Sequence, residues 1–263
     1  CKMLSQAEKG GVQNTIQNCV TVLQNDPVLA DSIRLNLLSE RIDIVKPMGW
    51  QRSGPTLTDT DMMYILRRME KYGLYSEKRV SAAIRIVANE NHYHPIRDYL
   101  NDLKWDGTAR IRHALHRFLG AAEDELTAEA LKIFLLGAIK RVFHPGCKFE
   151  MMLCLVGGQG AGKSSFFRLL AIKDEWFSDD LRRLDDDNVF RKLQGHWIME
   201  MSEMIATANA KSIEEIKSFL SKQKETYKIP YETHPADRLR QCVFAGTTNR
   251  QDFLPRDRTG NRR

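Results

Sequence analysis

The sequence predicts an α/β fold, with a largely parallel sheet and flanking helices, preceded by a small all-helical domain. Three observations support this prediction. Residues up to about 126 show an interrupted helical pattern, residues 149–156 form a nearly continuous apolar run, and a glycine-rich stretch follows that run directly. Such a run is typical of a strand buried on both faces of a parallel sheet. We therefore expect a helical domain over residues 1–126 and an α/β domain over 127–263.

The helical domain is predicted from apolar periodicity and from turn signals. Six helical segments are expected, at residues 15–23, 28–38, 59–72, 77–89, 96–103 and 111–118. Thr58 and Ser76 stand where N-caps belong, and Pro95 suits a first helical turn. We find no internal repeat and no glycine-serine linker, so we expect the two domains to pack against each other.

The α/β domain begins with a long apolar helix, from Thr127 to Val142, which His144, Pro145 and Gly146 end. Two further apolar runs, at residues 197–201 and 242–245, each end in polar residues. In an open parallel sheet, ligands bind beyond the carboxyl ends of the strands. This order of strands and polar ends is the layout of a nucleotide-binding domain.

Composition bounds the class of protein. A chain of 263 residues with 42% apolar and 28% charged residues is long enough for two globular domains. Its five cysteines are odd in number and lack a C-x-x-C pair, which fits neither a disulfide framework nor a zinc site. No apolar run approaches the roughly 18 residues of a membrane span, so we expect a cytoplasmic protein that contacts no membrane.

The charge and the chain ends give weaker indications. A net charge of +6 is compatible with binding to a polyanion, although many other proteins are equally basic. The chain begins without Met and ends at Arg263, directly after a turn-like Thr259-Gly260. We expect it to be a fragment, with the α/β domain truncated at its C-terminus.

The glycine-rich stretch matches the phosphate-binding motif G-x-x-x-x-G-K-[ST] in full. Its context, between a buried strand and a helix, makes this signal specific. Backbone N–H groups of such a loop surround phosphates, its Lys reaches the β- and γ-phosphates, and its Ser hydroxyl ligates Mg²⁺. We expect ATP and Mg²⁺ to bind here. The predicted cofactor-binding residues are Gly157, Gly158, Gln159, Gly160, Ala161, Gly162, Lys163, Ser164 and Ser165.

A phosphate loop of this kind needs a carboxylate on a neighbouring strand to hold Mg²⁺. Glu200 and Glu203 are both candidates, and residues three apart on a regular strand point to opposite faces. Glu203 lies where the apolar run ends, so it is our preferred residue for the metal and the attacking water. For Glu200, a catalytic role and a structural ion pair are equally compatible with the sequence.

Two further groups of residues are candidates for hydrolysis. Asn249 follows the third strand, with Thr248 beside it, and a polar side chain there can touch the γ-phosphate or the attacking water. Arg262 and Arg263 are candidates for an arginine finger, which offers a permanent charge to the transition state, often from a neighbouring subunit. A solvated basic terminus is the competing interpretation of these two arginines.

Taken together, these motifs resemble the virulence-associated protein E family of phage and mobile-element proteins, whose ATPase core is similar to superfamily three helicases of the AAA-plus class. The resemblance rests on the phosphate loop and on five further segments, at residues 94–107, 145–149, 197–203, 246–250 and 260–263. It implies an ATP-hydrolysing DNA helicase or translocase subunit in DNA replication, acting in the bacterial cytoplasm. It also implies a homo-oligomeric ring, expected to be a hexamer, that moves along DNA.

The same resemblance favours a DNA-binding hairpin between the second and third strands. Ring helicases of this type insert such a hairpin into the central channel, where cations meet phosphates and aromatic rings stack on bases. The candidate contacts with single-stranded DNA are Lys222, Lys224, Lys228, Arg238 and Arg240. A solvated charged surface is the alternative, because acidic residues lie nearby.

Two other functions remain open from sequence. One is a P-loop kinase that transfers phosphate to a small molecule, although kinases usually lack a polar strand end followed by clustered arginines. The other is a nucleotide-dependent switch or assembly module with little turnover. His113 and His116 lie three apart on a predicted helix, but no convincing third ligand accompanies them, so we predict no zinc site there.

Overall fold

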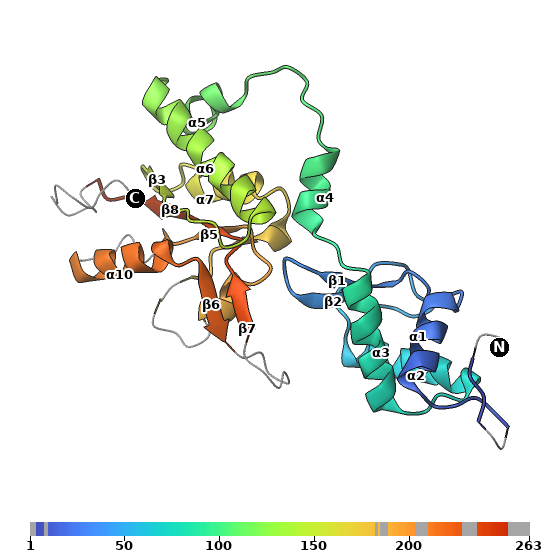
Figure 1. Cartoon of the computed structure of the whole chain (residues 1–263). Helices are drawn as coiled ribbons and strands as arrows, with labels where there is room; N and C mark the ends of the chain where they lie inside the picture. The colour runs from blue at the N-terminus through green and yellow to red at the C-terminus, as the bar shows by residue number, and fades with distance from the viewer. Residues whose placement is uncertain are drawn as a thin grey trace. The chain divides into compact units, whose positions relative to one another are not determined.

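The computed structural model of the chain describes residues 4–7, 10–181, 184, 189–202, 210–227 and 236–251, with the backbone alone for 210–212 and 227. The chain divides into two compact units, Cys1–Tyr99 and Leu100–Arg263, which we call the first and second units (Figure 1). This division comes before the predicted domain boundary at residue 126. Residues 100–126 belong to the second unit, where helix α5 (Ile111–Leu119) contacts helix α6 (Glu125–Phe143).

The first unit is mainly helical and contains one small hairpin. Its helices start largely where the sequence predicts: Thr58 caps α2, Ser76 caps α3, and α4 begins at Pro95. Its core lies between α1 and α3 and includes the fully buried Leu23 and Ile84. The elements are α1 Ile16–Asn25, β1 Ile33–Asn36, β2 Arg41–Ile44, α2 Asp59–Met69, a 3-10 turn Glu70–Tyr72, α3 Glu77–Glu90 and α4 Pro95–Asp102, which crosses into the second unit.

The helix predicted over residues 28–38 is wrong. Asp31 has a positive φ of 56°, a left-handed backbone conformation that a helix cannot contain. Beyond it, β1 pairs antiparallel with β2, with Ile33 opposite Ile44, and both side chains are buried. Pairing with a strand later in the chain therefore overrides the local apolar pattern that favoured a helix.

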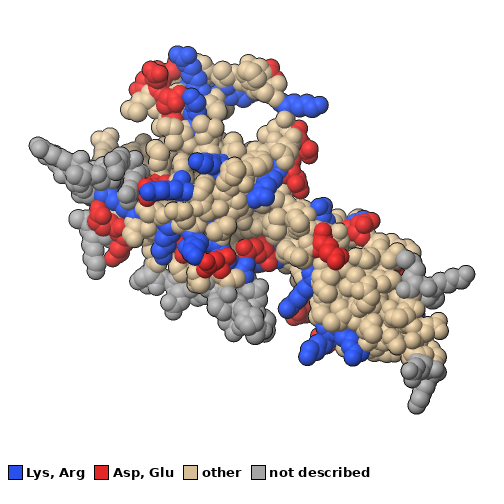
Figure 2. Space-filling model, in the orientation of Figure 1, with Lys and Arg blue, Asp and Glu red and all other residues tan. Residues whose placement is uncertain are grey.

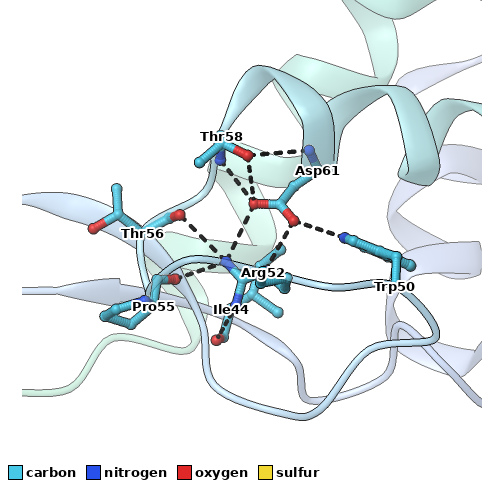
Figure 3. A network of polar contacts seen from close by, with 7 residues as sticks. All are labelled: Ile44, Trp50, Arg52, Pro55, Thr56, Thr58 and Asp61. Carbon is cyan, nitrogen blue, oxygen red and sulfur yellow. Dashed lines mark hydrogen bonds and ion pairs between the residues drawn. The ribbon is translucent and has the colours of Figure 1, made fainter.

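A buried carboxylate, Asp61, organises the start of α2 (Figure 3). Thr58 and Asp61 form a capping box, in which each side chain bonds the other residue's backbone N–H. Arg52 Nε and the Trp50 indole N–H donate to Oδ1 of Asp61, at 2.8 and 2.7 Å. Burial alone would raise the pKa of Asp61, but the hydrogen bonds from Arg52, Trp50 and Thr58 hold it well below its usual range. Asp61 is therefore a fully partnered, structural carboxylate.

The second unit is the predicted α/β domain. After α5 and α6 it contains β3 Met152–Val156, α7 Lys163–Leu170, a 3-10 turn Asp174–Trp176, β4 Phe177–Ser178, α8 Val189–Leu193, β5 Ile198–Glu200, α10 Ala210–Ser221, β6 Lys224–Tyr227, β7 Ala236–Leu239 and β8 Val243–Thr248. The three strands predicted from apolar runs are confirmed as β3, β5 and β8. The two-residue strand β4 was not predicted.

Four parallel strands form the central sheet in the order β3-β8-β5-β4. Thus β8 lies between the strand that enters the phosphate loop and the strand that ends in Glu200. Helices flank this sheet, as Figure 1 shows. The carboxyl ends of β3, β8 and β5 consequently meet at one edge, where the sequence places its polar residues.

Helix α6 is fixed against the opposite end of the sheet. The guanidinium of Arg141 is fully buried and donates to the carbonyls of Cys242 and Phe149, at 2.8 and 2.7 Å. The indole N–H of Trp197 donates to the carbonyl of Ala138, also on α6, at 3.0 Å. Phe149, Cys242 and Trp197 lie shortly before β3, β8 and β5, respectively. These bonds therefore hold the amino ends of β3, β8 and β5 against one helix.

Within the described residues, no helix has the combination of length and hydrophobicity that a membrane span requires.

Candidate nucleotide-binding site

The phosphate loop joins β3 to α7 in the way that its motif predicts. Gly160 and Gly162 have φ values of 79° and 81°, which side chains other than glycine rarely adopt. Gly162 is the N-cap of α7, so the loop turns sharply just before Lys163 begins the helix. The N–H of Gly157 donates to the carbonyl of Thr248 at 3.1 Å and ties the start of the loop to the end of β8. The loop therefore has a fixed origin and a glycine-dependent turn.

The ammonium group of Lys163 lies against the loop itself. Its Nζ donates to the carbonyls of Gly157 and Gly158, at 2.8 and 2.7 Å. These bonds hold a positive charge beside the amino end of α7, whose backbone N–H groups also favour anions. The loop thus combines a cation with helix-terminal donors, a suitable arrangement for polyphosphate.

Glu200 lies directly beside the phosphate loop. It is the last residue of β5 and only 1% exposed. The Ser164 hydroxyl donates to its Oε1 at 2.7 Å, and the Thr247 hydroxyl donates to the same oxygen. Its Oε2 is buried and has no hydrogen-bond partner in the described part of the chain. The carboxylate is therefore held by two hydroxyls and has no cation among its hydrogen-bond partners in the described chain.

Glu203, which the sequence favoured for the metal, lies outside the described residues, so its role stays a prediction. What the structure adds is the position of Glu200, the other candidate carboxylate. The hydroxyl of the motif's serine contacts Glu200 across the gap between α7 and β5. Of the two candidates, Glu200 is the one whose contact with the phosphate loop lies within the described residues.

A cleft of about 560 Å³ opens at the carboxyl edge of the sheet. Thr248 and Asn249, the polar residues at the end of β8, line its wall, and Asn249 is exposed. The complete lining is Gln159, Gly160, Ala161, Gly162, Lys163, Ser164, Ser165, Ser202, Thr247, Thr248 and Asn249. The predicted arginine-finger residues, Arg262 and Arg263, lie outside the described residues.

Thr247 is one of two cleft-lining residues, with Ser202, that sequence reasoning missed. It is 5% exposed, lines the cleft and bonds Glu200. The available signal was a pair of threonines at the end of an otherwise apolar strand. Thr248 and Asn249 lie nearer the turn, whereas the order of strands, which puts Thr247 beside Glu200, is not visible in the sequence.

The predicted basic hairpin is present as the antiparallel pair β6 and β7. Lys224 forms an ion pair with Asp237 across the two strands. Lys222 lies 3.8 Å from Glu225 and contacts the ring of Phe190. Lys222 and Lys224 are exposed and Arg238 is half-buried, whereas Lys228 lies outside the described residues. Figure 2 shows basic and acidic side chains close together over the described part of the visible face.

Arg240 requires a correction, because the structure does not leave it available to DNA. It is 3% exposed, forms an ion pair with the buried Glu225 and donates to the carbonyl of Phe219. Its guanidinium lies 4.5 Å from the ring centroid of Phe219 and 5.1 Å from that of Phe244. These contacts join the hairpin to α10 and β8, so Arg240 is a packing residue.

The histidine pair on α5 has an acidic neighbour. Nδ1 of His113 and Nε2 of His116 lie 2.5 and 4.0 Å from the carboxylate of Glu123. Among the residues that the structure describes, no group of three or more His, Cys, Asp and Glu could hold a metal ion. Hydrogen bonding between α5 and the loop before α6 accounts for this cluster.

Comparison with known proteins gives a family and related solved structures. Residues 100–263 match the model of the virulence-associated protein E-like domain. Two solved apo structures of the NrS-1 C-terminal region match at 13% identity, with TM-scores of 0.46 and 0.49. The alignments cover 82% and 90% of this chain but only 53% and 57% of those chains. No curated protein matches. Because the family model spans more than half of the chain, the chain belongs to the virulence-associated protein E-like domain family, whose core is a P-loop nucleoside triphosphatase.

Proposed function

We propose that this chain hydrolyses ATP with Mg²⁺ and uses the hydrolysis to move along DNA, as a helicase or translocase subunit in phage or mobile-element replication. The observation that carries the ATP-hydrolysing part of the proposal is the contact between Ser164 and the buried Glu200 at the edge of the cleft. It adds a candidate metal site to the phosphate loop, and binding of a nucleotide alone would not require a buried carboxylate there.

The residues present fit Mg²⁺. In phosphate-binding sites this ion usually takes one or two protein carboxylates together with substrate phosphates. Ser164 and Glu200 would hold it, which assigns to Glu200 the metal role that the sequence favoured for Glu203. Bound Mg²⁺ supplies positive charge that neutralises the phosphates.

The remaining groups of the site bind and orient. Lys163 and the loop N–H groups bind the phosphates, and the buried Thr247 and Thr248 form part of the cleft wall. Asn249, exposed at the cleft, is our candidate for orienting the attacking water. Glu203 stays a candidate for the same task.

The proposed function also includes assembly into a ring and contact with DNA. We expect a homo-oligomeric ring, a hexamer, in which Arg262 or Arg263 reaches the site of a neighbouring subunit. The exposed Lys222 and Lys224, together with Lys228 and Arg238, are the candidate contacts with single-stranded DNA. The opposite charges of Asp237 and Glu225 limit the net field of the hairpin, so we expect moderate affinity with a clear salt dependence.

The decisive experiment measures ATP turnover of wild type with and without single-stranded DNA, beside Lys163→Ala, Glu200→Gln and Glu203→Gln. Glu129→Gln, an exposed carboxylate paired with Lys132 on α6, is the matched control. We expect DNA to stimulate wild type, and Lys163→Ala and Glu200→Gln to reduce turnover by on the order of 10²-fold. The control should behave as wild type.

The result also separates the alternatives. Transfer of phosphate to a small acceptor would identify a kinase, and nucleotide binding without turnover would identify a switch or assembly module. Turnover that DNA does not alter would leave an ATPase and remove the DNA part of the proposal.

A further inference from the structure

Thr247 lines the candidate site without belonging to the phosphate-loop motif. It lies on β8, the strand between β3 and β5, and its backbone pairs with Leu155 of β3. On the other side of β8, Ala245 pairs with Glu200. Thr247 is two residues beyond Ala245 and so shares its face of the strand. This register brings the Thr247 hydroxyl to the Glu200 carboxylate.

The two carboxylate oxygens of Glu200 differ in their hydrogen-bond partners. Oε1 accepts hydrogen bonds from both Ser164 and Thr247, whereas Oε2 has no hydrogen-bond partner in the described chain. A carboxylate can rotate about its last torsion, which is broad and roughly two-fold. With only the bond from Ser164, a side chain that also serves the nucleotide, Glu200 would lose one of the two donors that fix its plane.

Threonine is suited to this task. Its β-branched side chain is stiff about χ1, so a threonine hydroxyl in a central strand has a well-defined position. Thr247 is also 5% exposed, so water competes little for its hydroxyl. It therefore gives Glu200 a donor whose position does not depend on the nucleotide.

We propose that Thr247 is a positioning residue for divalent-metal binding: its hydroxyl holds Oε1 of Glu200 toward Ser164, and this orientation presents the carboxylate to a nucleotide-bound divalent cation. The proposal rests on the metal role proposed above for Glu200. Hydrogen-bond partners of metal-ligating groups typically change metal affinity or activity by about 10- to 100-fold when they are removed.

The test compares Thr247→Val, which removes the hydroxyl with little change of shape, and Thr247→Ser, which keeps it. Thr21→Val, on α1 of the first unit, is the matched control. Mn²⁺ affinity is measured by electron paramagnetic resonance with a non-hydrolysable ATP analogue present, and affinity for the same analogue is measured in EDTA. The Mg²⁺ concentration for half-maximal ATP turnover is measured in parallel.

We expect Thr247→Val to weaken Mn²⁺ binding by about 10-fold or more and to raise the half-maximal Mg²⁺ concentration, with metal-free analogue affinity unchanged. Thr247→Ser should restore most of the Mn²⁺ affinity, and Thr21→Val should match wild type. Equal Mn²⁺ affinity in wild type and Thr247→Val would overturn the proposal. So would a loss of metal-free analogue affinity together with a lower melting temperature, because that pattern marks a purely structural residue.

Metal positioning by Thr247 and ATP hydrolysis can fail independently of each other. If wild type binds Mn²⁺ with the analogue but turns over no ATP, while Thr247→Val weakens Mn²⁺ binding, the positioning role stands and hydrolysis fails. If wild type hydrolyses ATP with DNA stimulation and Thr247→Val binds Mn²⁺ normally, hydrolysis stands and the positioning role fails.

Discussion

Two buried carboxylates, one in each unit, are almost equally inaccessible but have different partners. Asp61 in the first unit is 2% exposed and accepts bonds from the guanidinium of Arg52, the indole of Trp50 and the backbone and hydroxyl of Thr58 (Figure 3). Glu200 in the second unit is 1% exposed, and within the described chain it accepts bonds from two hydroxyls alone.

The absence of a cation does not by itself mark a functional carboxylate, because Asp43 of the first unit, 1% exposed, also accepts hydrogen bonds from neutral side chains, those of Asn36 and Tyr93. A buried charge is costly unless it is paired, so a carboxylate neutralised by a fixed arginine has its compensation within the fold. Asp61 meets this condition. Glu200 has hydrogen bonds but no cation among its hydrogen-bond partners in the described chain, and it lies beside a phosphate loop. That combination favours a role toward a cation that arrives with a ligand.

Another buried carboxylate of the second unit, Glu225, is of the structural kind. It is 7% exposed and paired with the buried Arg240, and it joins β6 to the end of β7. Glu200 therefore differs from Asp61 and Glu225 in its hydrogen-bond partners, which include no arginine in the described chain, and the unit in which a carboxylate lies does not explain this difference.

The largest expected effect is on the first unit. Asp61→Ala leaves Arg52, whose side chain is 12% exposed, without its carboxylate and removes half of the capping box. Removing one member of a buried pair typically costs about 3–5 kcal/mol. Hydrogen exchange of amides in β2 and α2 of the full chain should show this loss, while ATP affinity per folded molecule stays unchanged. A loss below about 1 kcal/mol, the range of exposed pairs, would mean that Asp61 is not a structural carboxylate.

The next effect concerns Arg240. Arg240→Met keeps an apolar stem between Phe219 and Phe244 but leaves Glu225 with Lys222 as its cation. We expect a loss of about 3 kcal/mol in the protection of α10 and β6 amides. The salt slope of single-stranded DNA binding should not change, because a buried residue releases no counterions.

Lys224→Ala combined with Lys228→Ala is the matched comparison for Arg240. If both lysines contact phosphates, the slope of log affinity against log salt concentration should become shallower by about 1.4, since each phosphate contact with a single strand contributes about 0.7. If Arg240→Met altered the salt slope of DNA binding and the double lysine variant did not, Arg240 would be the DNA contact and the two lysines would not.

Glu200→Gln should separate activity from stability. The amide keeps an oxygen that accepts from Ser164 and Thr247, so we expect the free energy of unfolding to change by less than about 1 kcal/mol. Turnover should fall by on the order of 10²-fold, which corresponds to about 2.7 kcal/mol in the barrier. Calorimetry and steady-state kinetics on the same preparation measure both. Destabilisation comparable to that of Asp61→Ala would make Glu200 structural as well.

The sequence allowed the parts of the fold with strong local signals to be predicted. The strand–loop–helix around Gly157 to Ser164 and the apolar runs of β5 and β8 depend on composition over a few residues. The misassigned segment at residues 28–38 and the unpredicted strand β4 depend on pairing with distant strands, for which no local signal exists. The same reason explains the site: the register of β8 against β3 and β5 decides that Thr247 meets Glu200. It also explains Arg240, whose partner Glu225 is set by the pairing of β6 with β7.

The smallest expected effect is a pH dependence that sharpens the contrast. The pKa of Asp61 is depressed in the folded chain, because hydrogen bonds from Arg52, Trp50 and Thr58 outweigh the effect of burial. A depressed carboxyl pKa gives stability that is complete above the unfolded pKa of about 3.9 and is lost as pH falls through the folded pKa. Between pH 6 and 8 the stability of the first unit should therefore not depend on Asp61 titration. Below about pH 4 wild type should lose protection of α2 amides more steeply than Asp61→Asn, which has no charge to lose. Parallel acid profiles for the two proteins would show that the Asp61 network contributes no charge-dependent stability. Glu200→Gln should leave the acid profile of the first unit unchanged.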